Sequence, residues 1–173
     1  MKGKTLVKFF IVAIAVITFA SCIQPVDPAI DRTAATEQAE LNEYIDTLHH
    51  RGLNVDTTDL GVYYVVSQAG DGPYPAEGDT CILKYEGFLL SSGAVFDNSA
   101  LHNHTDSTFT YIMGETNVIT GWADGMKVVN EGSVVYLIIP SEFAYGSNGN
   151  YYNIGPYETL VFRVDMLDIK QAY

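Results

Sequence analysis

The chain has 173 residues, of which 47% are hydrophobic, 17% charged and 12% aromatic. This length and apolar content are sufficient for one ordinary hydrophobic core, so we expect a single globular domain rather than a disordered chain. The formal charge is −12 at pH 7. Such an acidic chain repels phosphate backbones and anionic lipid headgroups, which argues against nucleic-acid binding and against electrostatic docking on membranes.

Residues 1–21 are predicted to be a signal peptide. A basic start precedes an apolar run over residues 9–19 that is too short to span a bilayer comfortably. Small residues then lead to Cys22, as in a bacterial lipobox, although Phe19 replaces the usual leucine. We therefore expect lipidation at Cys22 and a lipid-anchored location in the bacterial cell envelope, facing the periplasm or the cell surface. The alternative is a plain secretory peptide that leaves Cys22 as an odd thiol.

Residues 22–33 contain two prolines and no apolar period, which predicts a linker behind the lipid anchor. Residues 34–52 are predicted to form an N-terminal helix that ends at Gly52. We expect its apolar stripe to pack on the body or on a second copy of the chain, with acidic residues such as Glu37 on the other faces. The stripe follows the spacing i, i+3, i+4 and i+7 and consists of Leu41, Tyr44, Ile45 and Leu48.

Residues 53–173 are predicted to form the folded domain. Its period-two apolar runs, bounded by turn residues, indicate strands at 62–66, 80–90, 94–97, 109–113, 133–139 and 159–169. A helical pattern occurs only over residues 118–129, where Trp122 and Met126 share one face. This combination predicts an α+β fold in which a curved antiparallel sheet wraps around one short helix.

Residue types suited to metal or nucleophilic chemistry are sparse. His102 and His104 lie near Asp106 in a polar loop, but a further ligand at a defined spacing is missing, so a solvated loop is favoured over a metal site. Cys81 lies within a predicted strand without a basic neighbour, which indicates a buried and inert thiol. We expect no metal and no cofactor, because no phosphate-binding, dinucleotide-binding or nucleophile-elbow motif is present in the sequence.

An ordered series of aromatic and glycine motifs runs through the β-rich region. The series comprises Tyr85-x-Gly87, Phe96-Asp97, Phe109-x-Tyr111-x2-Gly114, Val118-Ile119-x-Gly121-Trp122, Phe143-Ala144-Tyr145-Gly146, Ile154 and Thr159-Leu160-Val161-Phe162. Its order and spacing, over about residues 72–169, resemble the FKBP-type peptidyl-prolyl cis-trans isomerases. The resemblance implies the same curved sheet and short helix, together with a shallow apolar pocket.

The resemblance also implies roles for individual residues. Trp122 would form the floor of the pocket. Tyr85, Asp97 and Tyr145 would be catalytic, with Tyr145 donating a hydrogen bond to the substrate carbonyl and Asp97 accepting one from Tyr85. The substrate-binding residues would be Phe96, Phe109, Val118, Ile119, Trp122, Ile154 and Phe162.

Two loops depart from the family pattern. The loop after Asp97 lacks the basic residues that often accompany this aspartate, so we expect Asp97 to be less well paired. The loop over residues 148–153 replaces a small turn that contains proline, and we expect its tyrosines, Tyr151 and Tyr152, to narrow or extend the pocket.

By resemblance, the protein is expected to be a peptidyl-prolyl cis-trans isomerase that assists the folding of envelope or secreted proteins. Its partners would be proline-containing polypeptide clients. We also expect macrolide ligands and a homodimer through the N-terminal helix. Nucleic acid is not an expected partner, and the protein would contact the membrane through its lipid anchor alone. The alternative hypothesis is a non-catalytic FKBP-like module that binds peptides or acts as a chaperone on a lipoprotein.

Overall fold

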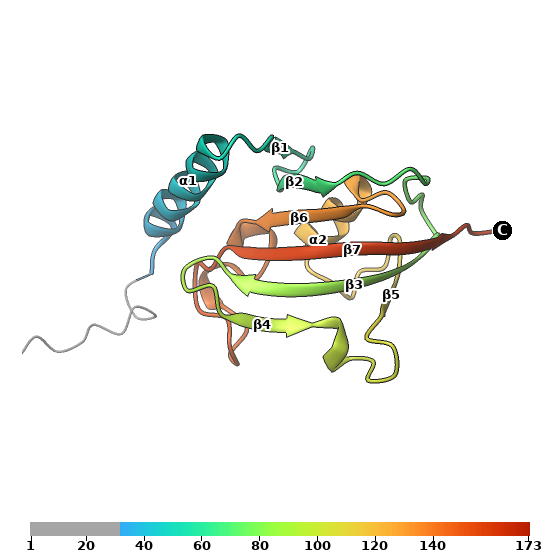
Figure 1. Ribbon diagram of the computed structural model, residues 1–173. Coiled ribbons are helices and arrows are strands. Elements are labelled where there is room, and N and C mark those ends of the chain that lie inside the picture. The colour runs from blue at the N-terminus through green and yellow to red at the C-terminus, as the bar shows by residue number, and fades with distance from the viewer. Residues whose placement is uncertain (1–31) are drawn as a thin grey trace, which may run out of the picture.

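The computed structural model describes residues 32–173 (Figure 1). The predicted signal peptide, Cys22 and most of the predicted linker lie outside the described residues. Within residues 32–173, no helix combines the length and the apolar character needed to cross a membrane.

The core of the structure is one curved antiparallel sheet of seven strands, which confirms the predicted fold class. Its strands follow the order β1-β2-β6-β7-β3-β4, and β5 pairs with β3. The six predicted strands are all present, and no end is shifted by more than two residues, whereas the two-residue β1 is too short to produce a period in the sequence. The strands are β1 Asp56–Thr57, β2 Tyr63–Gln68, β3 Thr80–Leu89, β4 Val95–Asn98, β5 Phe109–Ile112, β6 Val134–Ile139 and β7 Leu160–Lys170.

Strand β3 shares one edge between two short partners. Its first half pairs with β5, with Leu83 opposite Phe109, and its second half pairs with β4, with Gly87 opposite Asp97. The other edge of β3 pairs with β7 along its whole length. This arrangement places Tyr85 between the end of β4 and the start of β5, although the two strands are separated by a ten-residue segment.

The predicted helix over residues 118–129 is shorter in the structure. It consists of α2, Thr120–Gly125, followed by the 3₁₀ turn η2, Met126–Val128. Two glycines of α2 allow the helix to approach β6 closely: a Cβ atom at Gly121 would overlap the side chain of Ile139, and one at Gly125 would lie 2.7 Å from Leu137 Cδ1. The helix therefore lies directly against the sheet, as Figure 1 shows behind β6 and β7.

The alternation of side chains along β6 divides the apolar residues into two clusters. Leu137 and Ile139 belong to the main core, together with Trp122 and Met126, whereas Ile138 belongs to a cluster on the opposite face of the sheet. This split follows from the two-residue period of a strand.

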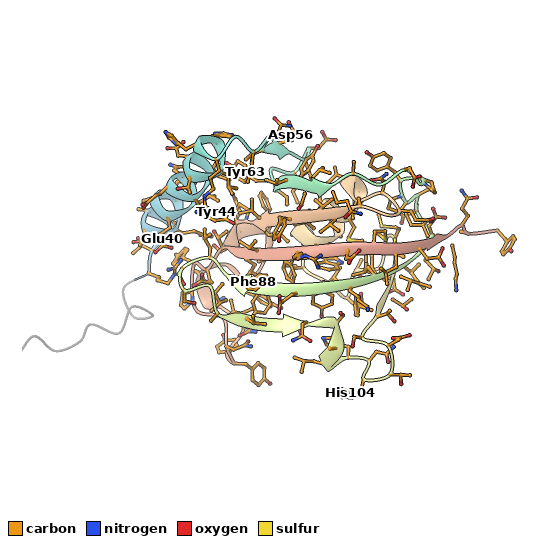
Figure 2. All side chains as sticks on the ribbon, viewed as in Figure 1. Glu40, Tyr44, Asp56, Tyr63, Phe88 and His104 are labelled. Atoms are coloured by element: carbon orange, nitrogen blue, oxygen red, sulfur yellow. The ribbon has the colours of Figure 1, made fainter. Side chains whose placement is uncertain are left out.

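The helix α1, Ala34–His50, covers the second cluster. Leu41 and Leu48 of its predicted stripe are buried there against Val65, Ile138 and Val161, so the stripe packs on the body of the same chain. Tyr44 and Phe88, labelled in Figure 2, also pack against this cluster. The expectation that Glu37 lies on another face than the stripe was wrong, because it lies one turn before Leu41 and is buried, with hydrogen bonds to Ser141 and Thr159.

We predict that Gly121→Ala lowers the free energy of unfolding by about 1–3 kcal/mol, because the added methyl group overpacks the contact between α2 and Ile139. Urea denaturation measures the change. Gly155→Ala is the matched control: a Cβ at Gly155 meets no atom within 4 Å, so its effect should stay within about 0.5 kcal/mol. Equal stability of the two variants would contradict the close packing of α2.

Candidate active site

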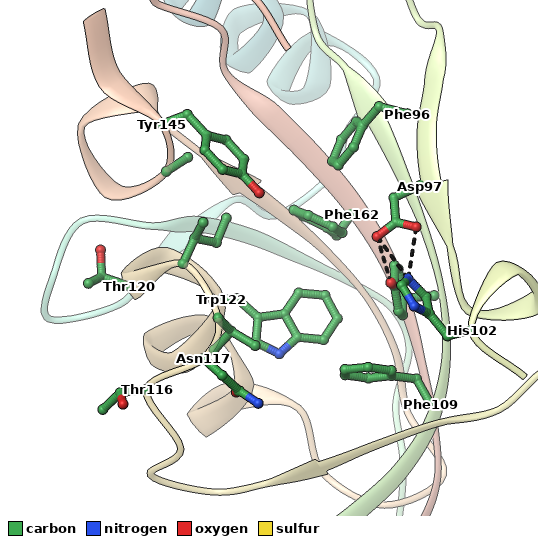
Figure 3. A pocket seen from close by; sticks show the side chains of 14 residues that line it. Phe96, Asp97, His102, Phe109, Thr116, Asn117, Thr120, Trp122, Tyr145 and Phe162 are labelled. Atoms are coloured by element: carbon green, nitrogen blue, oxygen red, sulfur yellow. Dashed lines mark hydrogen bonds and ion pairs between the residues drawn. The ribbon is translucent and has the colours of Figure 1, made fainter. Parts of the chain in front are cut away.

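A pocket of about 720 Å³ opens between α2, β4, the start of β5 and the segment that contains Tyr145 (Figure 3). Most of its lining residues are aromatic or aliphatic, and the others are polar or charged. The lining residues are Tyr85, Phe96, Asp97, His102, Phe109, Thr116, Asn117, Val118, Ile119, Thr120, Trp122, Ala144, Tyr145 and Phe162.

Trp122 lies at the centre of the pocket (Figure 3). Its ring meets Phe162 edge-on, with centroids 5.0 Å apart and planes at 75°, and meets Tyr85 at 5.2 Å and 70°. Phe109 adds a third edge-on contact at 6.4 Å. Each such contact contributes about 0.5–1.5 kcal/mol beyond the burial of area, so the indole is held firmly. Its Nε1–H is buried and has no hydrogen-bond partner among the described residues.

Two aromatic rings in the wall of the pocket leave no space for a side chain at Gly87. A Cβ atom there would lie 2.7 Å from the ring of Phe96 and 2.9 Å from the ring of Phe162. Without it, these two rings meet edge-on at 5.4 Å and 85°. The motif Tyr85-x-Gly87 thus combines one aromatic residue in the pocket with the space that two others need.

The polar edge of the pocket is centred on the carboxylate of Asp97. Tyr85 Oη donates a hydrogen bond of 2.7 Å to Asp97 Oδ2, and the backbone N–H of Asn98 donates one of 2.8 Å to Oδ1. His102 Nε2 lies 3.0 Å from the same Oδ1. Asp97 is therefore surrounded by partners, and the expectation that it would be less well paired was wrong.

Sequence reasoning missed His102, which it placed in a solvated loop. The 3₁₀ turn η1, Ser99–Leu101, bends the chain back after β4, and Asn98 caps this turn by accepting a 3.2 Å hydrogen bond from Leu101 N. As a result, His102 returns to the carboxylate five residues before it in the sequence. The asparagine, which can cap a short turn, and the histidine that follows were the available signal that the chain returns to Asp97. Short turns of this kind produce no hydrophobic period, so the pattern was not recognised.

The electrostatic environment keeps the two hydroxyl groups of the site protonated. Burial raises the pKa of Tyr85, and its hydrogen bond to Asp97 and the charge of that carboxylate raise it further. Burial also raises the pKa of Tyr145, with a smaller contribution from the charge of Asp97. Both side chains therefore remain hydrogen-bond donors across the physiological pH range.

Tyr145 lies between the 3₁₀ turns η3, Ser141–Phe143, and η4, Gly146–Asn148. It is 38% exposed, and its hydroxyl group points into the pocket (Figure 3). The hydroxyl of Tyr85 also lies in the pocket, but it already donates its hydrogen bond to Asp97. Tyr145 therefore offers a hydroxyl donor near the apolar floor that is not committed to Asp97.

The loop that follows is ordered by one asparagine. Asn150 Oδ1 accepts hydrogen bonds of 2.9–3.0 Å from three backbone N–H groups, those of Tyr152, Asn153 and Ile154. Tyr151 and Tyr152 are 89% and 95% exposed and do not line the pocket, so the expectation that they narrow or extend it was wrong.

The predicted site residues come together with one exception. Nine of the ten line the pocket, whereas Ile154 is 4% exposed and belongs to the main core. Besides His102, sequence reasoning missed Thr116, Asn117, Thr120 and Ala144, whose residue types carry no distinctive chemical signal.

Metal-binding residue types are scattered in the structure. Within residues 32–173, no group of three or more His, Cys, Asp or Glu side chains lies close enough to hold a metal ion. His104 is exposed on the loop between β4 and β5 (Figure 2) and is not among the residues that line the pocket. Cys81 is fully buried, and burial together with the charge of Asp79 raises the pKa of its thiol to about 11.

The fold and the pocket define a class of protein. The model of the family described as FKBP-type peptidyl-prolyl cis-trans isomerase matches residues 72–167, and the chain belongs to this family. Over 149 residues the chain is 36% identical to the FKBP-type peptidyl-prolyl cis-trans isomerase FkpA of Escherichia coli strain K12, a match that covers 83% of this chain and 50% of that protein. It is 32% identical over 133 residues to the peptidyl-prolyl cis-trans isomerase Mip of Coxiella burnetii, covering 77% of this chain and 55% of that protein.

The chain thus spans about half the length of the curated relatives it matches. Among solved structures, the crystal structure of FkpA from Escherichia coli is similar, with a TM-score of 0.66 and 36% identity over 81% of this chain and 62% of that one. A peptidyl-prolyl cis-trans isomerase from Pseudomonas syringae pv. tomato has a TM-score of 0.65 and 25% identity, over 82% of this chain and 98% of that one.

We predict that Tyr85 contributes to a loss of stability in alkaline solution. Its pKa is raised in the folded state, so the unfolded chain releases this proton first, near pH 10, and stability falls as the pH rises further. For one such tyrosine the loss at pH 10.5 is about 0.8 kcal/mol. The free energy of unfolding is measured with urea at pH 7 and at pH 10.5. Between these two pH values it should fall less in Tyr85→Phe than in the wild type, by about this amount.

Tyr74→Phe, at a tyrosine that is 63% exposed, is the control and should lose as much stability at pH 10.5 as the wild type does. An unchanged decline in Tyr85→Phe would contradict the assignment of this hydroxyl as a buried donor to Asp97.

Proposed function

We propose that this chain is a peptidyl-prolyl cis-trans isomerase that acts on X-Pro bonds of polypeptide segments. The observation that carries the proposal is the pocket itself, in which an apolar floor at Trp122 lies beneath the inward-pointing hydroxyl of Tyr145. Membership of the FKBP-type family supports the same activity.

The apolar part of the pocket acts on the amide that must rotate. The barrier to this rotation is about 18–20 kcal/mol, because twisting removes the resonance of the peptide bond. The planar amide has the larger charge separation, so a site that takes water away from it favours the twisted form. The prolyl ring would rest on Trp122 between the rings of Phe109 and Phe162, which fix its position during the rotation.

The polar part of the site acts on the carbonyl groups of the substrate. Tyr145 Oη would donate a hydrogen bond to a carbonyl oxygen next to the twisting bond. Asp97 would act indirectly: it holds Tyr85 and His102 and gives the pocket a polar edge along which the substrate backbone can lie. No nucleophile is needed, because the reaction breaks no covalent bond.

We predict that Tyr145→Phe lowers isomerase activity about 3- to 30-fold, the effect of losing one hydrogen bond worth about 0.5–2 kcal/mol in the transition state. Asp97→Ala should lower activity by a similar factor of about 3 to 30, because Tyr85 and His102 lose the carboxylate that holds them. Trp122→Ala should be more harmful, because it also opens a cavity and costs about 3–5 kcal/mol of stability. Activity is measured on proline-containing tetrapeptides, and the unfolding of each variant is measured separately.

Trp122 is the only tryptophan of the chain, so its fluorescence reports directly on the pocket. A wild-type protein that shows no activity on several proline peptides, while its fluorescence still responds to them, would overturn the catalytic proposal. A peptide-binding module would then be the better description.

For the whole protein we propose the organisation expected from the sequence: signal peptide 1–21, lipid-anchored linker 22–33, N-terminal helix 34–52 and isomerase domain 53–173. Clients would be envelope or secreted proteins whose folding waits for X-Pro isomerisation, which takes 10–100 s without a catalyst. Macrolides would enter the same pocket as the prolyl ring. A homodimer through α1 would have to use the exposed face of the helix, because Leu41 and Leu48 are buried against the sheet.

We predict that Cys22 is acylated. The wild type should partition into the detergent phase and Cys22→Ala into the aqueous phase, because the acyl chains supply the membrane affinity. Phase separation followed by mass spectrometry of the N-terminal peptide measures both. A mature wild-type protein with an unmodified Cys22 thiol would contradict the prediction.

A further inference from the structure

The segment that carries Tyr145 is attached on two sides to the N-terminal helix and to Arg32 just before it. The first attachment is Glu37, in the first turn of α1, whose side chain is 7% exposed. Glu37 Oε1 accepts hydrogen bonds from Ser141 N at 2.6 Å and from Thr159 Oγ1 at 2.7 Å, and Oε2 accepts one from Ser141 Oγ at 2.6 Å. Hydrogen bonds to a carboxylate are stronger than those between neutral groups, so this contact is well defined.

Ser141 transmits this contact to the pocket because it begins η3. Ala144 N donates a 2.9 Å hydrogen bond to Ser141 O, and Phe143 O accepts one of 3.1 Å from Thr120 Oγ1 on α2. The position of Ser141 therefore determines where Ala144 and the following Tyr145 lie. It also sets the distance between this side of the pocket and the helix of Trp122.

The second attachment lies on the other side of Tyr145. Arg32, whose side chain is 8% exposed, donates a 2.9 Å hydrogen bond from Nη2 to Tyr157 O. Tyr157 N in turn donates one of 2.9 Å to Gly146 O, next to Tyr145. Arg32 is itself fixed by ion pairs of 2.8 Å with Glu40 and 3.4 Å with Glu158.

Apolar packing does not explain these attachments. The apolar side chains of α1 lie against β2, β6 and β7, on the face of the sheet opposite the pocket. Between the start of α1 and the segment of Tyr145 there is instead a cavity of about 350 Å³, lined in part by Glu37, Ser141, Gly146 and Tyr157. The link between the helix and the pocket rim is therefore made by polar contacts, and the three hydrogen bonds that Glu37 accepts offset the cost of removing its carboxylate from water.

We propose that Glu37 is a positioning residue for Tyr145: through Ser141 it sets the place of the Tyr145 hydroxyl over the pocket. The N-terminal helix is then part of the machinery of the site rather than only a cover for the sheet. This inference rests on the proposed isomerase function, in which Tyr145 donates to the substrate carbonyl.

Glu37→Gln tests the proposal with little change of shape. The amide oxygen can accept two of the three hydrogen bonds, but the negative charge that strengthens them is lost and the third donor loses its acceptor, so the hold on the segment weakens. We expect kcat on a proline tetrapeptide to fall by about 3- to 10-fold while KM changes less than twofold, because the lost interaction matters in the transition state. Glu43→Gln is the matched control, since it makes the same change at an exposed position of the same helix and should behave as the wild type.

A double-mutant cycle separates positioning from a general loss of stability. If Glu37 acts through Tyr145, Glu37→Gln should slow the Tyr145→Phe enzyme less than twofold, because the hydroxyl that it positions is already absent. Leu48→Ala weakens the docking of α1 three turns away, and any effect that it has on kcat should be the same with and without Tyr145→Phe. Equal effects of Glu37→Gln in the two backgrounds would overturn the proposal, as would wild-type kcat in Glu37→Gln.

Hydrogen exchange gives a readout that does not need activity. Amides of residues 144–146 should exchange at least threefold faster in Glu37→Gln than in Glu43→Gln, and unchanged exchange there would overturn the proposal. An inactive wild type would refute the isomerase function, whereas the exchange result would still decide whether Glu37 holds this segment. Ser141→Ala, which removes one of the three donors, should change exchange in the same direction and serves if Glu37→Gln does not fold.

Discussion

The structure depends on the packing of Trp122 between the short helix and the concave face of the sheet. Gly121 and Gly125 allow α2 to lie close to β6, and the indole then meets Tyr85 and Phe162 edge-on. The same ring is part of the main core and the floor of the pocket. The floor of the pocket is therefore formed by side chains that also pack in the core, so its shape is largely set before a substrate binds.

The polar groups are placed around this floor by the topology. Because β4 and β5 share one edge of β3, Asp97 and Phe109 both lie beside Tyr85. The carboxylate engages Tyr85 and His102, whereas the hydroxyl of Tyr145 points into the pocket from the opposite side. This division suits the rotation of an amide, which requires an apolar surface and a well-placed donor rather than a reactive group.

Much of this protein follows from its sequence. Strand periods and turn residues were sufficient to predict the α+β class, six strands and the short helix. The resemblance to a known family, carried by the ordered motifs, then pointed to nine of the residues that line the pocket. These features depend on local chemistry: alternation specifies which residues face the core, and glycine marks places where backbones or rings come close. Gly87 and Gly121 are examples, since each leaves space for a particular neighbouring side chain.

Only the tertiary structure decided the contacts between residues far apart in the chain. Glu37 was expected away from the apolar stripe because it is acidic, although it lies one turn before Leu41. Helix spacing shows which residues share a face, but not that Ser141 and Thr159 would meet this carboxylate. Ile154 matched the motif series, yet the neighbouring loop, ordered by Asn150, directs it into the core. The sequence by itself determined the elements and the pocket type, whereas partners more than a hundred residues apart were selected by the packing of whole elements.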